Sequence, residues 1–330
     1  MTAPDLPKID LHLHLEGAAP PAFVRDRARA RHIDIGGLFD EAGGYRIDGF
    51  AKALQVRDAV AGVLGTPEDY HALTLEVLHR SADDGVIYTE AFLSPDFCGG
   101  RSVIAFREYV AAIAEAAAQA EAERGIVMRG IVTCFRHLGP QRARQTALCA
   151  AEAADGFVRG FGIAGDETML HPRDFAWPFD AAREAGLRLT AHAGERRGPE
   201  GIRDTLAALR PDRIGHGVRA VEDPALVDEL AGRGIVLEVC PGANLALGLY
   251  PDCAAHPVGR LRDRGVKVAI GTDDPSFLGT SMVREYDRLA QAFGWDEGAF
   301  RAIAAASLDA AFCDAKTRAR VADRLEPAHA

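Results

Sequence analysis

Eight short, mostly apolar runs alternate with longer helix-forming stretches along this chain. The runs are Lys8–His14, Val86–Phe92, Ile126–Cys134, Val158–Ala164, Leu187–Ala193, Arg213–Gly217, Ile235–Cys240 and Val266–Thr272. The segments between them are rich in Ala, Glu and Arg, which favour helices, and are long enough for crossover connections. Strands that alternate with helices predict a parallel sheet, and eight such units predict a closed (β/α)8 TIM barrel of the α/β class.

The length of 330 residues fits one barrel, although the usual prior also allows two domains. We find no low-complexity linker and no fixed-period repeat, so we expect a single domain over residues 1–330. One insertion, at about 20–61, follows the first run. Because it leaves the C-terminal end of a strand, we expect a helical lid over the barrel mouth, with Phe39, Phe50 and Leu54 underneath. A helical decoration packed on the rim is an equally good reading.

Composition excludes several classes of protein. Hydrophobic residues make up 48% and charged residues 26%, so a large core can form and intrinsic disorder is excluded. The net charge of −10 argues against a nucleic-acid partner. No apolar run approaches the roughly 20 residues that cross a bilayer, so we expect no membrane partner.

Cellular location is indicated by two features. The N-terminal sequence has no basic region followed by an apolar stretch, as a secretory signal would. The six cysteines are scattered without a CxxC pair, which favours neither a disulfide framework nor a thiolate zinc site. We therefore expect a cytoplasmic protein.

Two histidines share one face of the first run. Strand side chains alternate between faces, so His12 and His14 point the same way while Leu11 and Leu13 point the other. One face of a barrel strand lines the interior, where two imidazoles near the strand's end can share a cation. A lone histidine is more often structural, but this pair favours metal ligation.

Histidine or carboxylate residues lie at or just beyond the ends of three later runs. His192 ends the fifth run, with Glu195 a tight turn later, and a glutamate in a partly dry pocket has a raised pKa and can move a proton near neutrality. His216 lies between two glycines that let the backbone approach a ligand. Asp273 and Asp274 follow the eighth run. Alone, each has an ordinary structural reading, such as turn chemistry for the Asp pair.

Together these residues favour a metal site. Barrel active sites form at the C-terminal ends of the strands, where the first, fifth, sixth and eighth runs each supply His or Asp. Three neutral imidazoles and one carboxylate suit zinc, which keeps a position open for water in catalytic sites. Zinc lowers the pKa of that water from 15.7 to about 7. The sequence therefore predicts metal-assisted hydrolysis.

Two other strand ends carry weaker candidates. Gly165 follows the fourth run and offers a backbone N–H to a ligand, unless it is a plain turn before a helix. Cys240 ends the seventh run and could be a nucleophile. No positive partner is adjacent in sequence, so an inert buried thiol is the favoured reading.

From about Lys8 to Phe312, the chain resembles the adenosine and adenine deaminase family of the amidohydrolase superfamily. The resemblance rests on six motifs in family order and spacing. They are HLHLEG at 12–17, AGDE at 164–167, HAGE at 192–195, GHG at 215–217, CPGAN at 240–244 and GTDDP at 271–275. Membership implies a hydrolase with a lid, one zinc ion per subunit and a small-molecule purine substrate. It leaves open whether the protein is a monomer or a homo-oligomer.

The resemblance also implies roles for individual residues. The implied zinc ligands are His12, His14, His192 and Asp273. Glu195 resembles the donor that protonates purine N1 as C6 is attacked, and His216 the residue that orients the attacking hydroxide. Asp274 is similar to the residue that binds N7, and the Gly165 backbone to the donor for N3. The resemblance also implies that His14 contacts the substrate.

Departures from the family pattern bear on the substrate. Glu16 stands where adenosine deaminases usually carry an Asp that touches the ribose, and Glu is commoner in adenine deaminases. AGDE, however, resembles the adenosine branch, since the adenine branch tends to read DSSE. Phe92 stands where the adenosine branch often has Arg, and the stretch Gly242-Ala243-Asn244 departs from the common Ser-bearing version of its motif.

We therefore expect adenosine or 2′-deoxyadenosine as the substrate, deaminated to inosine or 2′-deoxyinosine and ammonia. The alternative is adenine, an N6-substituted adenine, or another modified 6-aminopurine nucleoside such as aminodeoxyfutalosine. An inactive nucleoside-binding relative is disfavoured because every expected catalytic position is filled. A two-metal amidohydrolase acting on another ring is disfavoured because no lysine lies at a strand's C-terminal end.

Overall fold

The computed structural model describes residues 6–326. The strands are β1 (Lys8–His14), β2 (Val86–Leu93), β3 (Val127–Phe135), β4 (Val158–Ala164), β5 (Arg188–Ala193), β6 (Arg213–His216), β7 (Val236–Val239) and β8 (Lys267–Ile270). The α-helices are α1 (Pro21–Ala30), α2 (Gly49–Val63), α3 (Pro67–Asp83), α4 (Val103–Arg124), α5 (Pro140–Ala153), α6 (Ala176–Glu184), α7 (Pro199–Leu209), α8 (Pro224–Arg233), α9 (Pro241–Ala246), α10 (Val258–Asp263), α11 (Met282–Phe293), α12 (Glu297–Ala310) and α13 (Ala315–Leu325). Short 3-10 helices are η2 (Arg136–Leu138), η3 (Pro172–Phe175) and η4 (Val218–Glu222).

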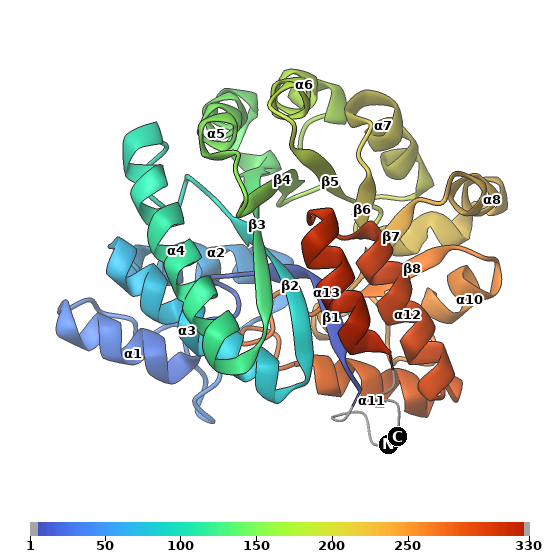
Figure 1. Ribbon diagram of the computed structural model, residues 1–330, viewed down its shortest axis with the longest axis horizontal. Helices are drawn as coiled ribbons and strands as arrows, with labels where there is room; N and C mark the ends of the chain where they lie inside the picture. Colours follow the sequence, from blue (N-terminus) through green and yellow to red (C-terminus); the bar gives the residue numbers. More distant parts are fainter. Residues whose placement is uncertain (1–5, 327–330) are drawn as a thin grey trace.

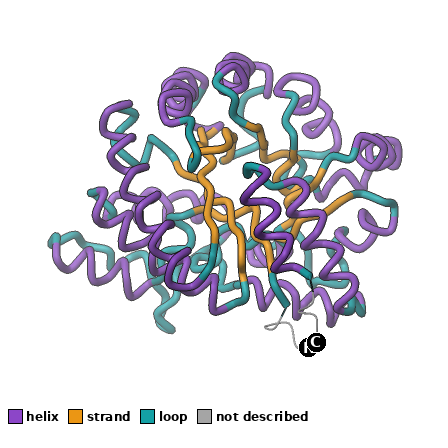
Figure 2. The backbone as a smooth tube through the Cα atoms, viewed as in Figure 1, coloured by secondary structure: helices purple, strands orange, loops and turns teal. Residues whose placement is uncertain are grey.

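The strands form one parallel sheet in sequence order from β1 to β8. The sheet closes where the segment after β8 returns to β1. The N–H of His14 donates to the carbonyl of Asp273 over 2.8 Å, and the N–H of Asp273 donates to the carbonyl of His12 over 2.7 Å. Helices surround the strands (Figure 1, Figure 2). The expected (β/α)8 barrel is confirmed.

Local sequence signals explain where several helices begin and end. Thr66 and Asp69 form a reciprocal capping box that starts α3 and satisfies otherwise free N–H groups. Gly125 and Gly234 follow α4 and α8 in left-handed backbone, with φ of 73° and 67°, which a residue without Cβ adopts at little cost. These turns direct the chain into β3 and β7.

The core has an apolar outer layer and a polar interior. Leu11 and Leu13 on β1 are buried in the apolar clusters outside the strands. Inside the barrel, Arg213 pairs with Glu90 over 2.6 Å and with Glu238 over 2.5 Å. The Arg213 guanidinium also lies 3.6 Å from the ring centroid of Phe312. A buried ion network and the Phe312 ring therefore lie beneath the predicted site.

The interval 20–61 contains α1 and most of α2, which lie on the same side of the barrel as α3 (Figure 1). Phe50 and Leu54 of α2 line a cavity at the barrel mouth. Phe39 instead packs against Tyr45 with tilted rings, whose centroids are 5.1 Å apart. Opening and closing of this segment, and its role as a lid, stay predictions.

Within residues 6–326, no helix combines the length and apolarity that spanning a membrane requires.

Candidate active site

The four residues predicted as metal ligands lie together at the C-terminal end of the barrel. Ring nitrogens of His12, His14 and His192 are within 4.8 Å of one another. Nε2 of His14 is 3.3 Å from Nε2 of His192 and 3.4 Å from Oδ1 of Asp273. All four side chains are buried. The structure therefore brings them together, and their binding of a metal stays a prediction.

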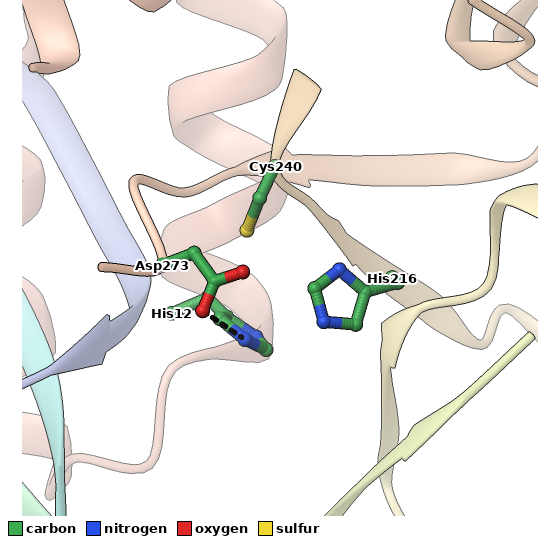
Figure 3. Close-up of side chains that lie close together, drawn as sticks. All are labelled: His12, His216, Cys240 and Asp273. Atoms are coloured by element: carbon green, nitrogen blue, oxygen red, sulfur yellow. Dashed lines mark ion pairs between the residues drawn. The ribbon is translucent and has the colours of Figure 1, made fainter. Parts of the chain in front are cut away.

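Cys240 and His216 border the same cluster. The side chains of His12, His216, Cys240 and Asp273 point toward one another (Figure 3), and each offers an atom within 4.8 Å of the others. Burial raises the pKa of the Cys240 thiol well above its ordinary value, and the charge of Asp273 adds to this effect. A protonated thiol is a poor ligand and nucleophile, so the inert reading of Cys240 fits this environment.

The donor set fits a divalent cation. Burial lowers the pKa of His12, His14 and His192 well below the ordinary value, so the imidazoles are neutral and have lone pairs to share. Nε2 of His12 is buried without a hydrogen-bond partner among the described residues. Burial, and next the charge of Asp274, raise the pKa of Asp273 to about 8. A cation here would satisfy the nitrogen and compensate the carboxylate.

Glycine makes room for this cluster. A Cβ on Gly215 would lie 3.0 Å from Cε1 of His12 and 3.2 Å from Nδ1 of His192. A side chain at this position would therefore push one or both rings aside by a few tenths of an ångström. The glycine before His216 therefore serves the neighbouring imidazoles.

Glu238 of β7 orients His12, a role that the sequence did not reveal. Nδ1–H of His12 donates to Oε2 of Glu238 over 2.8 Å, which leaves the Nε2 lone pair free. Oε1 of Glu238 accepts from Thr190 over 2.8 Å and from Arg213 over 2.5 Å. A carboxylate that accepts a hydrogen bond from the other ring nitrogen fixes the tautomer of a metal-binding histidine and raises its basicity. A buried glutamate inside an apolar run was the signal available in the sequence.

Glu195 is held by its backbone and by its side chain. Oε2 of Glu167 accepts from the N–H groups of Glu195 over 2.9 Å and of Arg196 over 2.6 Å, which fixes the turn after β5. Oε1 of Glu195 accepts from Asn244 over 2.9 Å. Burial, and next the charge of Glu167, raise the pKa of Glu195 to about 8. The side chain is therefore a neutral acid near pH 7, and Nδ1 of His216 is 3.7 Å from Oε1.

Asp274 contacts the segment predicted to be a lid. Arg57 of α2 donates to Oδ2 of Asp274, and both side chains are buried. Oδ1 of Asp274 is buried and has no partner among the described residues. A Cβ on Gly17 would lie 1.7 Å from this oxygen, so the close approach requires glycine. Asp274 thus keeps one oxygen for a ligand.

The remaining predicted residues differ in position. Gly165 lines the cavity and has φ of 88°, a conformation that favours glycine. Glu16 is buried, but its Oε1 accepts from the hydroxyl of Tyr70 over 2.9 Å, and it is not among the lining residues. Its contact with substrate stays a prediction.

The cavity at the barrel mouth comprises about 420 Å³ of space between atoms, part of which is open to solvent. Its lining residues are His14, Phe50, Ala53, Leu54, Arg57, Ala164, Gly165, His192, Glu195, His216, Leu247, Asp273, Asp274 and Leu278. A larger hollow of about 770 Å³ lies among Asp10, Arg80 and Thr280. It contains none of the predicted catalytic residues, so the smaller cavity is the candidate active site.

Comparison with known proteins gives one family. The adenosine deaminase family model matches residues 7–328. Adenine deaminase of Agrobacterium fabrum is 46% identical over 318 residues, covering 96% of this chain and 97% of its own. The crystal structure of adenine deaminase from Arthrobacter aurescens has a TM-score of 0.89 at 27% identity, covering 97% of this chain and 98% of its own. An amidohydrolase from Burkholderia ambifaria with bound zinc has a TM-score of 0.85 at 27% identity, covering 97% and 89%.

These relatives correct one expectation. Adenosine or 2′-deoxyadenosine was predicted as the substrate, in agreement with the resemblance of AGDE to the adenosine branch. The prediction is wrong, because the full-length relatives at this level of identity are named adenine deaminase. The physical reason is that Glu167 of this motif holds the backbone of the turn after β5, which does not depend on whether the substrate carries a sugar.

Proposed function

The chain belongs to the adenosine deaminase family and is a hydrolytic deaminase; from this premise, we propose that it deaminates free adenine to hypoxanthine and ammonia, using one zinc ion per subunit. The observation that carries the substrate proposal is the 46% identity, over nearly the whole of both chains, with a relative named adenine deaminase. The zinc proposal is supported by the buried donor set described above and by the zinc in the related amidohydrolase.

The proposed zinc ligands are His12, His14, His192 and Asp273. When bound there, zinc supplies a Lewis acid that makes water acidic enough to give hydroxide near neutral pH. Glu238 keeps Nε2 of His12 available as a lone-pair donor. The side chains around adenine carry out the other steps, which are proton transfer and orientation of the attacking oxygen.

Glu195 protonates N1 of adenine in this proposal. The aromatic C6 is a poor electrophile until N1 is protonated, and Glu195 carries its proton at neutral pH because burial raises its pKa to about 8. His216 lies beside Glu195 and orients the attacking oxygen. Water adds to C6, the C6–N6 bond breaks and ammonia leaves. One proton of the water restores Glu195 and the other leaves with ammonia, so the reaction consumes one water molecule.

Substrate contacts follow from the cavity lining. Asp274 has one unpartnered oxygen for N7, and the backbone N–H of Gly165 is proposed for N3. Glu16 accepts a hydrogen bond from Tyr70, so it differs from a carboxylate that is free to hold a ribose hydroxyl. Arg57 of α2 crosses to Asp274 and limits the space beside the base. These contacts favour a free base over a nucleoside.

The test is a panel of 6-aminopurines offered to the purified enzyme. Ammonia release is measured for adenine, N6-methyladenine, adenosine, 2′-deoxyadenosine and aminodeoxyfutalosine. Each reaction is repeated after treatment with a chelator and after zinc is restored. We expect adenine to be turned over fastest, activity to be lost with the chelator, and zinc to restore it.

Two results would count against the proposal. Faster turnover of another aminopurine would overturn the assignment of adenine and leave the hydrolytic mechanism standing. Full activity in metal-free protein, checked by elemental analysis, would overturn the role of zinc.

A further inference from the structure

A chain of hydrogen bonds extends from Glu195 away from the cavity. Oε1 of Glu195 is 2.9 Å from Nδ2 of Asn244, and Oδ1 of Asn244 is 3.0 Å from Nε2 of His256. Nδ1 of His256 is 3.2 Å from the backbone nitrogen of Val258. Asn244 and His256 are 0% and 1% exposed, and neither lines the cavity. Any effect on adenine must therefore pass through Glu195.

The backbone fixes the direction of every bond in this chain. The N–H of Val258 can only donate, so Nδ1 of His256 accepts and Nε2 carries the ring proton. Burial lowers the pKa of His256 to about 3, so the ring is neutral and has a single proton. Nε2–H donates to Oδ1 of Asn244, which turns the Nδ2 amide group toward Glu195. The amide orientation thus follows from a backbone group two residues beyond His256.

The last bond selects one oxygen of Glu195. Oε1 accepts from Asn244, so the proton of the neutral carboxyl belongs on Oε2. A carboxyl without this partner could carry its proton on either oxygen and could rotate between the two arrangements. Pre-orienting a proton donor lowers the cost of reaching the reactive geometry.

We propose that Asn244, held by His256, is a positioning residue that keeps the transferable proton of Glu195 on Oε2. The inference deepens the proposed function, because it rests on Glu195 as the acid that protonates the substrate. A purely structural role does not account for the two side-chain hydrogen bonds of Asn244. The backbone of Asn244 is already paired, with its N–H to Cys240 over 3.1 Å and its carbonyl to Leu249 over 2.9 Å. Both side-chain polar atoms are thus committed to Glu195 and His256.

The experiment compares four single variants and one double variant of the full-length, zinc-loaded enzyme with adenine as substrate. Asn244→Leu removes both polar atoms with little change in volume. His256→Phe removes the ring N–H, whereas His256→Gln replaces it with an amide N–H at a similar reach. Ser307→Ala is the matched control, because it removes a buried 2.8 Å hydrogen bond to Ile303 far along the chain in α12. Zinc content and the midpoint of thermal unfolding are measured for each.

We expect kcat to fall about 100-fold in Asn244→Leu, with KM within about threefold of the wild-type value, because proton transfer by a positioned group is worth about 10²–10⁴ in rate. His256→Phe should fall about 10-fold, while His256→Gln should restore kcat to within about threefold. The double variant Asn244→Leu/His256→Phe should be no slower than Asn244→Leu alone, because the two residues act in one chain. Ser307→Ala should keep the wild-type kcat.

The outcomes separate this inference from the proposed function. If the wild-type enzyme does not deaminate adenine, the proposed function fails. If the wild type is active and Asn244→Leu loses no more kcat than Ser307→Ala, only the positioning role fails. Equal losses in His256→Phe and His256→Gln, or a loss expressed only in KM or zinc content, would likewise overturn it.

Discussion

Two residues of the site have backbone conformations that L-residues rarely adopt. His216, at the end of β6, and Asp273, three residues after β8, both have φ of 62°. Each such conformation costs about 1–3 kcal/mol and persists where the surroundings impose it. In this structure the conformation turns the His216 side chain toward Glu195 and the Asp273 side chain toward the histidine cluster. The coincidence of strain with the predicted chemistry supports the assignment of this end of the barrel.

The contact between His12 and Glu238 gives the first prediction. In Glu238→Gln, zinc affinity should fall about 10–100-fold, because the carboxylate that fixes the His12 tautomer is lost. Competition with a chelator of known affinity measures the change. Glu229→Gln, at a half-buried glutamate of α8 that pairs with Arg203 and Arg233, is the control and should bind zinc as the wild type does. Unchanged affinity in Glu238→Gln would contradict the orienting role.

The protonation state of Glu195 gives the second prediction. Burial and Glu167 raise its pKa from 4.5 to about 8. Only the protonated form can donate to N1, so kcat/KM for adenine should decrease as the pH rises through about 8 and stay high at neutral pH. Steady-state rates across this range, with zinc content checked at each pH, measure the effect. A fall centred near the ordinary pKa of a glutamate would contradict the assignment.

Sequence spacing found the site residues that come in motifs, but not the partners that hold them. His12, His14, His192 and Asp273 stand out because histidine and aspartate interrupt the ends of apolar runs. Glu238 is 226 positions from His12, and no local pattern links the two. Asn244 is 49 positions from Glu195, and its role depends on the closure of the barrel. Such pairs become visible only when the fold is known.

At the scale of elements, α2 connects the inserted segment to the substrate cavity. Phe50 and Leu54 lie along the cavity, and Arg57 on the same helix donates to Asp274. The helix thus supplies both apolar cover and an anchor for a residue proposed to bind adenine. This contact makes the insertion part of the site.

Removal of this anchor gives the third prediction. In Arg57→Met, KM for adenine should rise about tenfold or more, because Asp274 loses its partner and α2 loses a buried ion pair with the barrel. Gln55→Met, on an exposed position of α2, controls for the added apolar side chain and should leave KM unchanged. Equal KM values for the two variants would show that Arg57 does not position Asp274.

The order and type of the strands could be predicted, whereas some of their ends could not. β1 and β4 have the predicted bounds. β4 ends where Gly165 turns the chain with φ of 88°, whereas no such signal follows β1, since the next residue is Leu15. The seventh run was predicted as Ile235–Cys240, but β7 spans Val236–Val239, because Cys240 is already the N-cap of α9. Tertiary pairing, rather than apolar composition, determines these ends.

At the scale of the whole molecule, one ion network fills the barrel beneath the site. Arg213 is 1% exposed on its side chain and pairs with Glu90 and Glu238, which are fully buried. Glu238 also accepts a hydrogen bond from His12. This one residue therefore takes part both in the packing of the barrel centre and in the geometry of the histidine cluster. Stability and ligand orientation are therefore coupled.

This network gives the fourth prediction. Arg213→Met should lower the free energy of unfolding by about 3–5 kcal/mol, because it leaves two buried carboxylates without their counter-charge. Arg264→Met removes a surface pair with Asp228 and should change stability by about 0–1 kcal/mol. Denaturant unfolding of the metal-free proteins measures both. Similar values for the two variants would show that the buried network does not stabilise the barrel.

The whole chain also explains why the substrate was mispredicted. Glu16 favours the adenine branch and AGDE the adenosine branch, and the predicted substrate agreed with AGDE. In the structure, Glu167 of that motif accepts backbone hydrogen bonds in the turn that carries Glu195. The proposed substrate contacts involve side chains spread over the turn after β1, α2 and the loop after β8, which short motifs do not combine.

The most direct measurement is anomalous diffraction at the zinc edge from crystals of the zinc-loaded enzyme. We predict one peak per subunit, about 2.0–2.2 Å from nitrogens of His12, His14 and His192 and from an oxygen of Asp273. Absence of a peak in the candidate active site, or a peak bound elsewhere in the chain, would contradict the metal site from which the proposed chemistry follows.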